Sequence, residues 1–320
     1  MTQERQFLVS PGPHLWKGLS VSKIMYLVVI ALMFPTGAAI YFFGHHALSV
    51  IGVSIGAAIA TEYVTKKIRG QPFIMDGSAV VTGLLLGLIL PPTISLWMVA
   101  IGAIFSIAIV KEAFGGLGHN IFNPALGGRA FMSVSFAAEM TTWTPTRFMP
   151  VMPDAVTTAT PLSESFVWPA DKLSLYQAMF MGNTAGSMGE TSALLILIGG
   201  ALLLGLRIIN WRIPAIYIGT VALMSLGFGQ DPLFHILAGG LMIGAFFMAT
   251  DYITCPLTNR GKMIFAVGVG ALTIIIRQFA GMPEGVCYSI LFMNAVTPLI
   301  DRFTKIRPYG LVVKKAESVS

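Results

Sequence analysis

Residues 24–43, IMYLVVIALMFPTGAAIYFF, form a run of twenty residues that contains no Asp, Glu, Lys or Arg. A run of about 20 apolar residues is long enough to cross the hydrocarbon core of a bilayer as an α-helix. Hydrophobic residues make up 55% of the 320-residue chain, and charged residues only 11%. The charged fraction is about half that of an average soluble domain. We therefore predict an all-α polytopic membrane protein.

About ten transmembrane helices are predicted when the apolar runs are read against Gly, Pro and charged residues. The run at 24–43 follows a polar arm and is too long for the hydrophobic part of a signal peptide, so it is expected to remain as the first span. The spans cover about 24–43, 47–64, 77–90, 94–110, 123–136, 192–206, 213–228, 233–249, 263–278 and 285–300.

These spans divide the chain into five parts. They are an N-terminal arm (1–23), a first membrane half of five helices (24–136), a long polar connection (137–191), a second membrane half of five helices (192–300) and a tail (301–320). Several spans are short and Gly-rich. Such segments are typical of broken or re-entrant helices that line a binding site.

Basic residues indicate the orientation, because Lys and Arg concentrate in cytoplasmic loops. Sixteen of the twenty lie in the N-terminal arm, in alternate loops and in the tail. Both termini are therefore predicted to be cytoplasmic, and the 137–191 connection extracytoplasmic. The same distribution explains the net charge of +6. Membrane lipid is thus an expected partner, and nucleic acid is not.

The two halves show an internal similarity. Residues 83–87 (GLLLG) resemble residues 240–244 (GLMIG). A basic residue and an asparagine follow each motif: Lys111 and Asn123 in the first half, and Arg277 and Asn294 in the second. A repeat of five spans must insert its second copy upside down, so an inverted repeat of five plus five helices is predicted. Chance similarity between Gly-rich helices is the alternative.

The polar connection contains residues 154–162, DAVTTATPL. Asp154, Thr157, Ala159 and Thr160 form the pattern D-x-x-T-x-A-T, which has the features expected of a covalent attachment site. A threonine hydroxyl is a poor nucleophile and needs an activating partner. On spacing alone, a Thr- and Asp-rich surface turn is the alternative interpretation.

This segment resembles the flavinylation motif of two membrane proteins. They are the D subunit of the Rnf electron transport complex and the B subunit of the Na+-translocating NADH:quinone reductase. The resemblance implies that FMN is esterified through its phosphate to Thr160, with Asp154, Thr157 and Ala159 as the other motif residues. Thr158 stands where the wider motif often has Gly. Residues 293–302 (MNAVTPLIDR) and the lack of a longer N-terminal extension favour the Rnf protein.

The resemblance implies a redox subunit of an ion-translocating ferredoxin:NAD oxidoreductase complex in the cell (inner) membrane, which is not active alone. It relays electrons coupled to Na+ or H+ transport. Its implied partners are the other Rnf subunits, including a second FMN flavoprotein and iron-sulfur subunits, and a flavin transferase during maturation. Two alternatives stay open: the quinone-reductase subunit, and a small-solute secondary transporter or channel without flavin.

Residues 186–193, GSMGETSA, end the polar connection. Backbone N–H groups and the side chains of Ser187, Glu190 and Thr191 could contact a phosphate or the polar edge of a flavin. A simple capping box from Ser187 to Glu190 is the alternative.

Asn123 and Arg129 lie in the short fifth span, and an arginine at membrane depth should face protein, cofactor or water. The resemblance also implies a second, non-covalent flavin, riboflavin. We expect Asn123, Arg129 and the helix ends near Thr250 and Asp251 to line its site. Cys255 and Cys287 are interpreted as ordinary membrane-helix thiols. Neither a catalytic residue nor a metal site is predicted.

Overall fold

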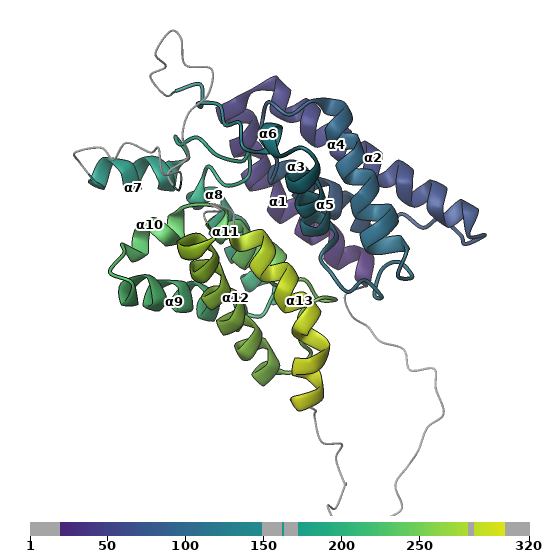
Figure 1. The fold of residues 1–320 in the computed structure, drawn as a ribbon. Coiled ribbons are helices and arrows are strands. Elements are labelled where there is room, and N and C mark those ends of the chain that lie inside the picture. Colours follow the sequence, from purple (N-terminus) through teal and green to yellow (C-terminus); the bar gives the residue numbers. More distant parts are fainter. Residues whose placement is uncertain (1–19, 149–161, 163–171, 281–284, 305–320) are drawn as a thin grey trace, which may run out of the picture.

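The computed structural model describes residues 20–148, 162, 172–280 and 285–304, and these residues form helices and no β-strand. The described part of the first half contains α1 (Val21–Phe43), α2 (His45–Ile68), α3 (Ser78–Leu88), α4 (Leu96–Phe105), the π-helix η1 (Ser106–Glu112) and α5 (Pro124–Ser135). The described part of the second half contains α8 (Ala193–Gly205), α9 (Arg212–Gly227), α10 (Pro232–Leu237), α11 (Leu241–Ile243), the π-helix η2 (Gly244–Met248), α12 (Asn259–Phe279) and α13 (Gly285–Phe303). Figure 1 shows the first half, in purple to blue, beside the green to yellow helices of the second.

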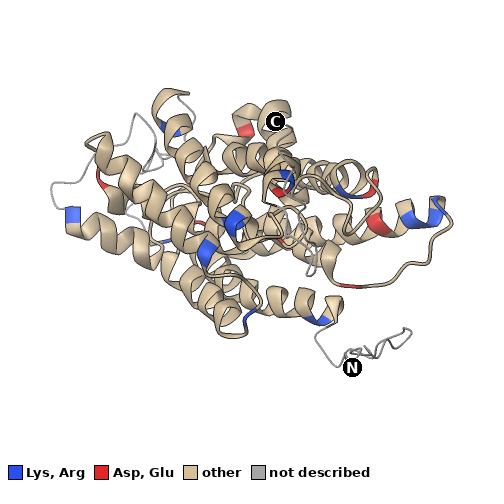
Figure 2. Ribbon diagram, turned by 90° about the horizontal axis from the view of Figure 1, so that it is seen from below, with Lys and Arg blue, Asp and Glu red and all other residues tan. Residues whose placement is uncertain are grey.

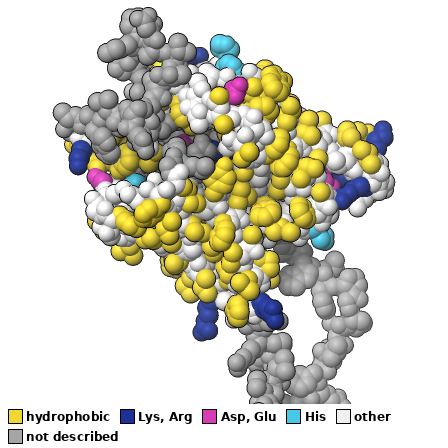
Figure 3. Space-filling view, in the orientation of Figure 1, with side chains coloured by type: hydrophobic (Ala, Val, Ile, Leu, Met, Phe, Trp, Pro, Cys, Tyr) yellow, Lys and Arg dark blue, Asp and Glu magenta, His cyan; other side chains and the backbone are white. Residues whose placement is uncertain are grey.

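Each predicted span coincides with helical structure, so the all-α class is confirmed. Within the described residues, α1, α2 and α12 are long and apolar enough to cross a membrane, and α3, α8 and α9 are shorter apolar helices. Large hydrophobic side chains cover much of the face in Figure 3. In Figure 2 the charged residues are few and several lie at helix ends. These features fit a membrane protein, and the number of spans stays a prediction.

The predicted span 233–249 is a broken helix. Its first piece, α10, ends at Leu237, and Gly239 and Gly240 follow with φ angles of 65° and 68° before α11 begins. This left-handed backbone is readily available to glycine. Arg277 of α12 donates to the carbonyl of His235 at 2.8 Å and to that of Ala238 at 2.8 Å. The guanidinium thus supplies donors that the last carbonyls of a helix lack.

A second buried cation lies in the first half. The ammonium of Lys111 in η1 donates to Glu62 Oε1 of α2 at 3.0 Å and to Ser78 Oγ of α3 at 2.6 Å. Lys66 also pairs with Glu62, at 2.8 Å. Lys111 and Glu62 are both almost completely buried. Because isolated buried charges are costly, this pairing holds three helical segments together.

Helices α2 and α3 pack at backbone contact. A Cβ atom on Gly83 would lie 2.7 Å from Ile55 Cα and 2.9 Å from the Ser54 carbonyl oxygen. The Ser54 hydroxyl donates to the carbonyl of Gly83 at 2.7 Å across the same contact. Neither backbone atom can rotate away as a flexible side chain could.

We expect Gly83→Ala to lower the stability of the protein by about 1–3 kcal/mol, the usual cost of overpacking a close-packed site. Gly56→Ala in α2 is the matched control, because a Cβ there meets nothing within 4 Å. The control should be neutral or stabilising, since alanine favours a helix over glycine. Apparent Tm values of the two purified variants in one detergent check this, and equal values would contradict the described packing.

The 137–191 connection contains two helices that the sequence did not predict, α6 (Ala137–Met140) and α7 (Lys172–Met181). Leu175 and Met179 of α7 pack against Phe234 and Ala238 at α10. The hydroxyl of Tyr176 donates to Asp231, and this hydrogen bond lowers the pKa of the Asp231 carboxyl. The end of the connection is therefore fastened to the broken helix of the second half.

Candidate functional site

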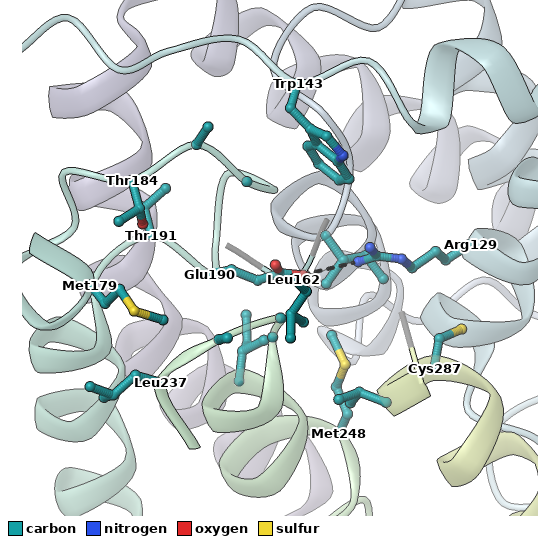
Figure 4. A pocket seen from close by; sticks show the side chains of 18 of the residues that line it. Arg129, Trp143, Leu162, Met179, Thr184, Glu190, Thr191, Leu237, Met248 and Cys287 are labelled. Carbon is teal, nitrogen blue, oxygen red and sulfur yellow. Dashed lines mark ion pairs between the residues drawn. The ribbon is translucent and has the colours of Figure 1, made fainter. Parts of the chain in front are cut away.

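A pocket of about 720 Å3, including the space at its open mouth, lies where the two halves and the connection meet. Its lining is mostly apolar with a few polar groups, which is the composition typical of small-molecule sites. Figure 4 shows Arg129, Glu190 and Leu162 at its centre. We call it the first pocket; its lining residues are Ile89, Leu126, Arg129, Trp143, Leu162, Met179, Thr184, Ala185, Gly186, Glu190, Thr191, Leu237, Ala238, Gly239, Gly240, Ile243, Met248, Val286 and Cys287.

Arg129 enters the first pocket from α5. Asn123 caps this helix, because its side chain accepts from Ala125 N at 3.1 Å, and Pro124 occupies the first turn. Arg129 Nη1 lies 3.5 Å from Glu190 Oε1, and only 5% of the Arg129 side chain is exposed. The predicted site residues Arg129 and Glu190 are thus brought together as an ion pair.

The segment before α8 is fixed against the end of α3. Gly189 N donates to the Leu88 carbonyl at 2.6 Å, and Met188 N donates to that of Leu90 at 3.3 Å. These two hydrogen bonds join the backbone of the segment to the end of α3 and the residues after it. They set the position of Glu190, which follows Gly189. The segment therefore belongs to the rigid frame of the first pocket.

The capping-box interpretation of Ser187 and Glu190 is wrong. Ser192 is the N-cap of α8, and its hydroxyl accepts from Leu195 N at 3.4 Å. Glu190 N instead donates to the Ser187 carbonyl in a turn, at 3.1 Å. The Ser187 hydroxyl is buried and has no hydrogen-bond partner among the described residues, whereas Thr191 donates to the Met188 carbonyl at 3.3 Å.

The glycine break between α10 and α11 makes room for two side chains of the first pocket. A Cβ on Gly240 would lie 2.6 Å from Glu190 Oε1, and one on Gly239 would collide with the Leu162 side chain. Bare backbone at these positions is what allows the close approach. Leu162 therefore brings the polar connection into contact with the second half, beside the ion pair (Figure 4).

A second pocket of about 730 Å3 lies near the other end of α5, where Asn123 lines it. The Asn120 side-chain oxygen is buried and without a hydrogen-bond partner among the described residues. The expected grouping of Asn123 with Thr250 and Asp251 is found here, but Arg129 faces the first pocket. The difference arises because Asn123 and Arg129 are almost two helical turns apart. The polar lining residues are Ser78, Thr82, Lys111, Asn120, Asn123, Thr250, Asp251 and Tyr252.

Four predicted site residues, Asp154, Thr157, Ala159 and Thr160, lie outside the described residues. Most lining residues of the first pocket were not selected from the sequence, and Trp143 and Cys287 are two of them. Both stand in stretches without a motif, and only the packing of α13 against α5 brings Cys287 to the pocket. No signal in the sequence would have distinguished this thiol from any other in a membrane helix.

Comparison with known proteins identifies the family. The sequence model of the NQR2, RnfD, RnfE family matches residues 8–310. The chain belongs to this family. The match covers both membrane halves and the connection between them, and therefore every element that lines the two pockets.

Members of the NQR2, RnfD, RnfE family with curated names align with nearly the whole chain. The protein is 51% identical to the D subunit of the proton-translocating ferredoxin:NAD(+) oxidoreductase complex of Clostridium ljungdahlii, over 95% of this chain and 96% of that one. It is 45% identical to the Na(+)-translocating counterpart of Acetobacterium woodii, over 98% and 99%. It is 35% identical to the D subunit of the ion-translocating oxidoreductase complex of Methanosarcina acetivorans, over 97% and 99%.

Proposed function

We propose that the protein is the D subunit of an Rnf-type ferredoxin:NAD oxidoreductase complex, carries FMN on Thr160 and relays electrons coupled to Na+ or H+ transport. The names of relatives that align along nearly their full length support the complex. The observation that carries the flavin assignment is the first pocket, which joins Arg129, Glu190 and Leu162 of the connection. The flavin would supply the redox chemistry, and the protein its position and electrostatics.

Covalent reach supports the assignment of Thr160. Leu162 lines the first pocket and follows Thr160 by two residues. Two residues of extended chain span at most about 7 Å. A group esterified to the Thr160 hydroxyl would therefore start close to the wall of this pocket.

The residues of the first pocket fit a flavin. Trp143, Met179 and Met248 offer apolar and aromatic surface for a ring system, and Arg129 offers a permanent positive charge for an electron-rich edge. These side chains would bind and orient the cofactor and exclude water from it.

The orientation follows from the distribution of basic residues. We place the protein in the cell (inner) membrane with both termini in the cytoplasm and the 137–191 connection outside, where a flavin transferase can reach Thr160. The outer face would then meet the second FMN flavoprotein. The iron-sulfur subunits would complete the electron route in the assembled complex.

We also propose the inverted repeat of five plus five helices. Lys111 and Arg277 are equivalent residues in the repeat, and their contacts support it. Lys111 donates to Ser78 at the start of the third span of the first half, and Arg277 donates to the carbonyl of His235 in the third span of the second half. In the amide orientation that satisfies both of its polar atoms, Asn294 accepts from Asn123 N at 3.2 Å. Equivalent residues of two inverted copies meet in this way near their shared axis.

The experiment that tests the flavin assignment is the intact mass of the chain purified from a host that has the flavin transferase, together with fluorescence of its band in a denaturing gel. We expect one FMN increment and a fluorescent band. A dark band at the bare polypeptide mass would instead favour the solute transporter. Ferredoxin-independent quinone reduction by the complex would favour the quinone-reductase subunit, an alternative that the relatives' names already disfavour.

We assign the second pocket to the non-covalent riboflavin. Thr82→Phe, which narrows this pocket, is expected to weaken binding by about 10–100-fold, because overpacking costs about 1–3 kcal/mol. Riboflavin extracted from purified protein measures this. Thr61→Phe is the control, since Thr61 makes the same side-chain hydrogen bond to its own helix but lines neither pocket. Equal riboflavin in both variants, with covalent FMN unchanged, would contradict the assignment.

A further inference from the structure

Glu190 and Arg129 form an ion pair in the first pocket. Among the described residues that line this pocket, they are the only carboxylate and the only permanent cation. The pocket walls are otherwise mainly apolar. A net charge in such surroundings is costly unless a counter-charge accompanies it. Any electron held in the pocket therefore calls for a compensating positive charge.

Resting on the proposed function, we propose that Glu190 takes up one proton when the flavin attached at Thr160 accepts an electron beside the first pocket, and releases it when the electron leaves. The electron comes from a reduced flavin or iron-sulfur group of a neighbouring subunit, and the proton comes from water at the pocket mouth. The proton bonds to a carboxylate oxygen of Glu190. Before reduction the positive charge of Arg129 balances the Glu190 carboxylate. After Glu190 is protonated, the same positive charge balances the added electron, so the total charge of the pocket is unchanged.

Three observations select Glu190 over its neighbours. Its side chain is 15% exposed against 5% for Arg129, so it lies nearer to water. Its carboxylate lies directly against the bare backbone of Gly240, where a Cβ would lie 2.6 Å from Oε1, so it is held at the pocket wall. Arginine cannot exchange a proton in proteins, and Cys287 carries no charge to compensate. The titratable groups on the surrounding elements are Arg129 (α5), Glu139 (α6), Lys172 and Tyr176 (α7), His235 (α10), Arg260, Lys262 and Arg277 (α12), and Cys287, Tyr288, Asp301 and Arg302 (α13).

Several of these groups bind other partners, are exposed to solvent or do not line the first pocket. Arg277 interacts electrostatically with Glu190, but its guanidinium donates to the carbonyls at the end of α10. Tyr176 is bound to Asp231, and Glu139 is exposed to solvent. His235 is buried in α10 and does not line the first pocket. Glu190 is therefore the group best placed to exchange a proton with the pocket.

The midpoint potential of the covalent flavin, measured against pH in the purified complex, tests the proposal. One proton per electron corresponds to about 59 mV per pH unit for a one-electron couple. Because the flavin ring takes up protons of its own on reduction, the signature is the difference between variants: we expect a smaller pH dependence in Glu190→Gln than in the unmodified chain, by up to this amount, and an unchanged one in Glu190→Asp, which keeps a carboxylate. In-gel fluorescence of each variant verifies that the flavin is attached. The same pH dependence in Glu190→Gln would overturn the proposal.

A measurement on the unmodified chain keeps the proposal testable even where Glu190→Gln does not acquire flavin. Reduction of the complex with isotopically labelled glutamate should produce the infrared band of a protonated glutamate carboxyl. No such band, or a potential that responds to Na+ instead of pH, would overturn proton uptake by Glu190. A wild-type chain without flavin would refute the proposed function itself, so the two failures are distinguishable.

Discussion

Thr160→Ala is expected to remove the covalent flavin completely, so that the chain has its bare polypeptide mass and its gel band is dark. The reason is chemical: a phosphoester needs the hydroxyl oxygen that alanine lacks. Electron transfer by the complex should fall to background, because the flavin carries the redox step. Intact mass and in-gel fluorescence measure the attachment, and ferredoxin-dependent NAD reduction by membranes measures the activity.

The neighbouring threonines provide the matched controls. Thr158→Ala should leave attachment intact, since Thr158 stands at a variable x position of the D-x-x-T-x-A-T pattern. Thr157→Ala removes a motif residue that is not the acceptor, and we expect slower or partial attachment. If Thr160→Ala retains the flavin and Thr158→Ala loses it, the acceptor is Thr158. If all three single variants retain the flavin, a threonine ester at this motif is refuted.

Lys111→Met is expected to destabilise the protein by up to about 3–5 kcal/mol, the cost of breaking a buried ion pair, reduced by the Lys66–Glu62 pair that remains. Lys111 and Glu62 have only 2% of their side chains exposed. Methionine keeps the apolar length of the side chain but leaves Glu62 and Ser78 without the ammonium. A lowered apparent Tm in detergent, or rapid loss of the monodisperse species on heating, would measure the effect.

Lys66→Met is the control, because Lys66 pairs with the same carboxylate from a position that is 15% exposed. Its loss should cost less, since Lys66 lies nearer to solvent than Lys111 and the fully buried Lys111 pair remains. The double variant Lys111→Met/Glu62→Gln should recover part of the stability, because the buried charge is removed along with its partner. Equal losses in the two single variants would contradict a special role for Lys111.

The helices could be predicted because apolar runs and Gly or Pro breaks determine where a membrane helix can lie. Gly44, with a φ of 81°, ends α1 where the sequence placed the boundary. The connection was harder to predict. α7 is a short segment whose helix is stabilised by tertiary contacts with Phe234, and local sequence does not reveal such contacts.

The candidate site was predicted in part. Arg129, Glu190 and Thr191 were selected from the sequence, and all three line the first pocket. Arg129 could be selected because a charge at membrane depth needs a partner or a function. The pairing of Arg129 with Glu190 could not be predicted, because it depends on how the two halves pack. The same holds for Cys287 and for the separation of Asn123 from Arg129, which follows from the direction in which each side chain leaves α5.

Helix α5 contributes Asn123 to one pocket and Arg129 to the other. It is packed so closely against η1 that a Cβ on Gly127 would lie 2.7 Å from the Val110 side chain. Six residues of helix rise by only about 9 Å. Helix α5 therefore joins the two pockets as a short rigid element, and a displacement of the helix at one pocket moves its residues at the other. A substitution that displaces α5 at one pocket should accordingly be compensated by a second substitution at the other pocket.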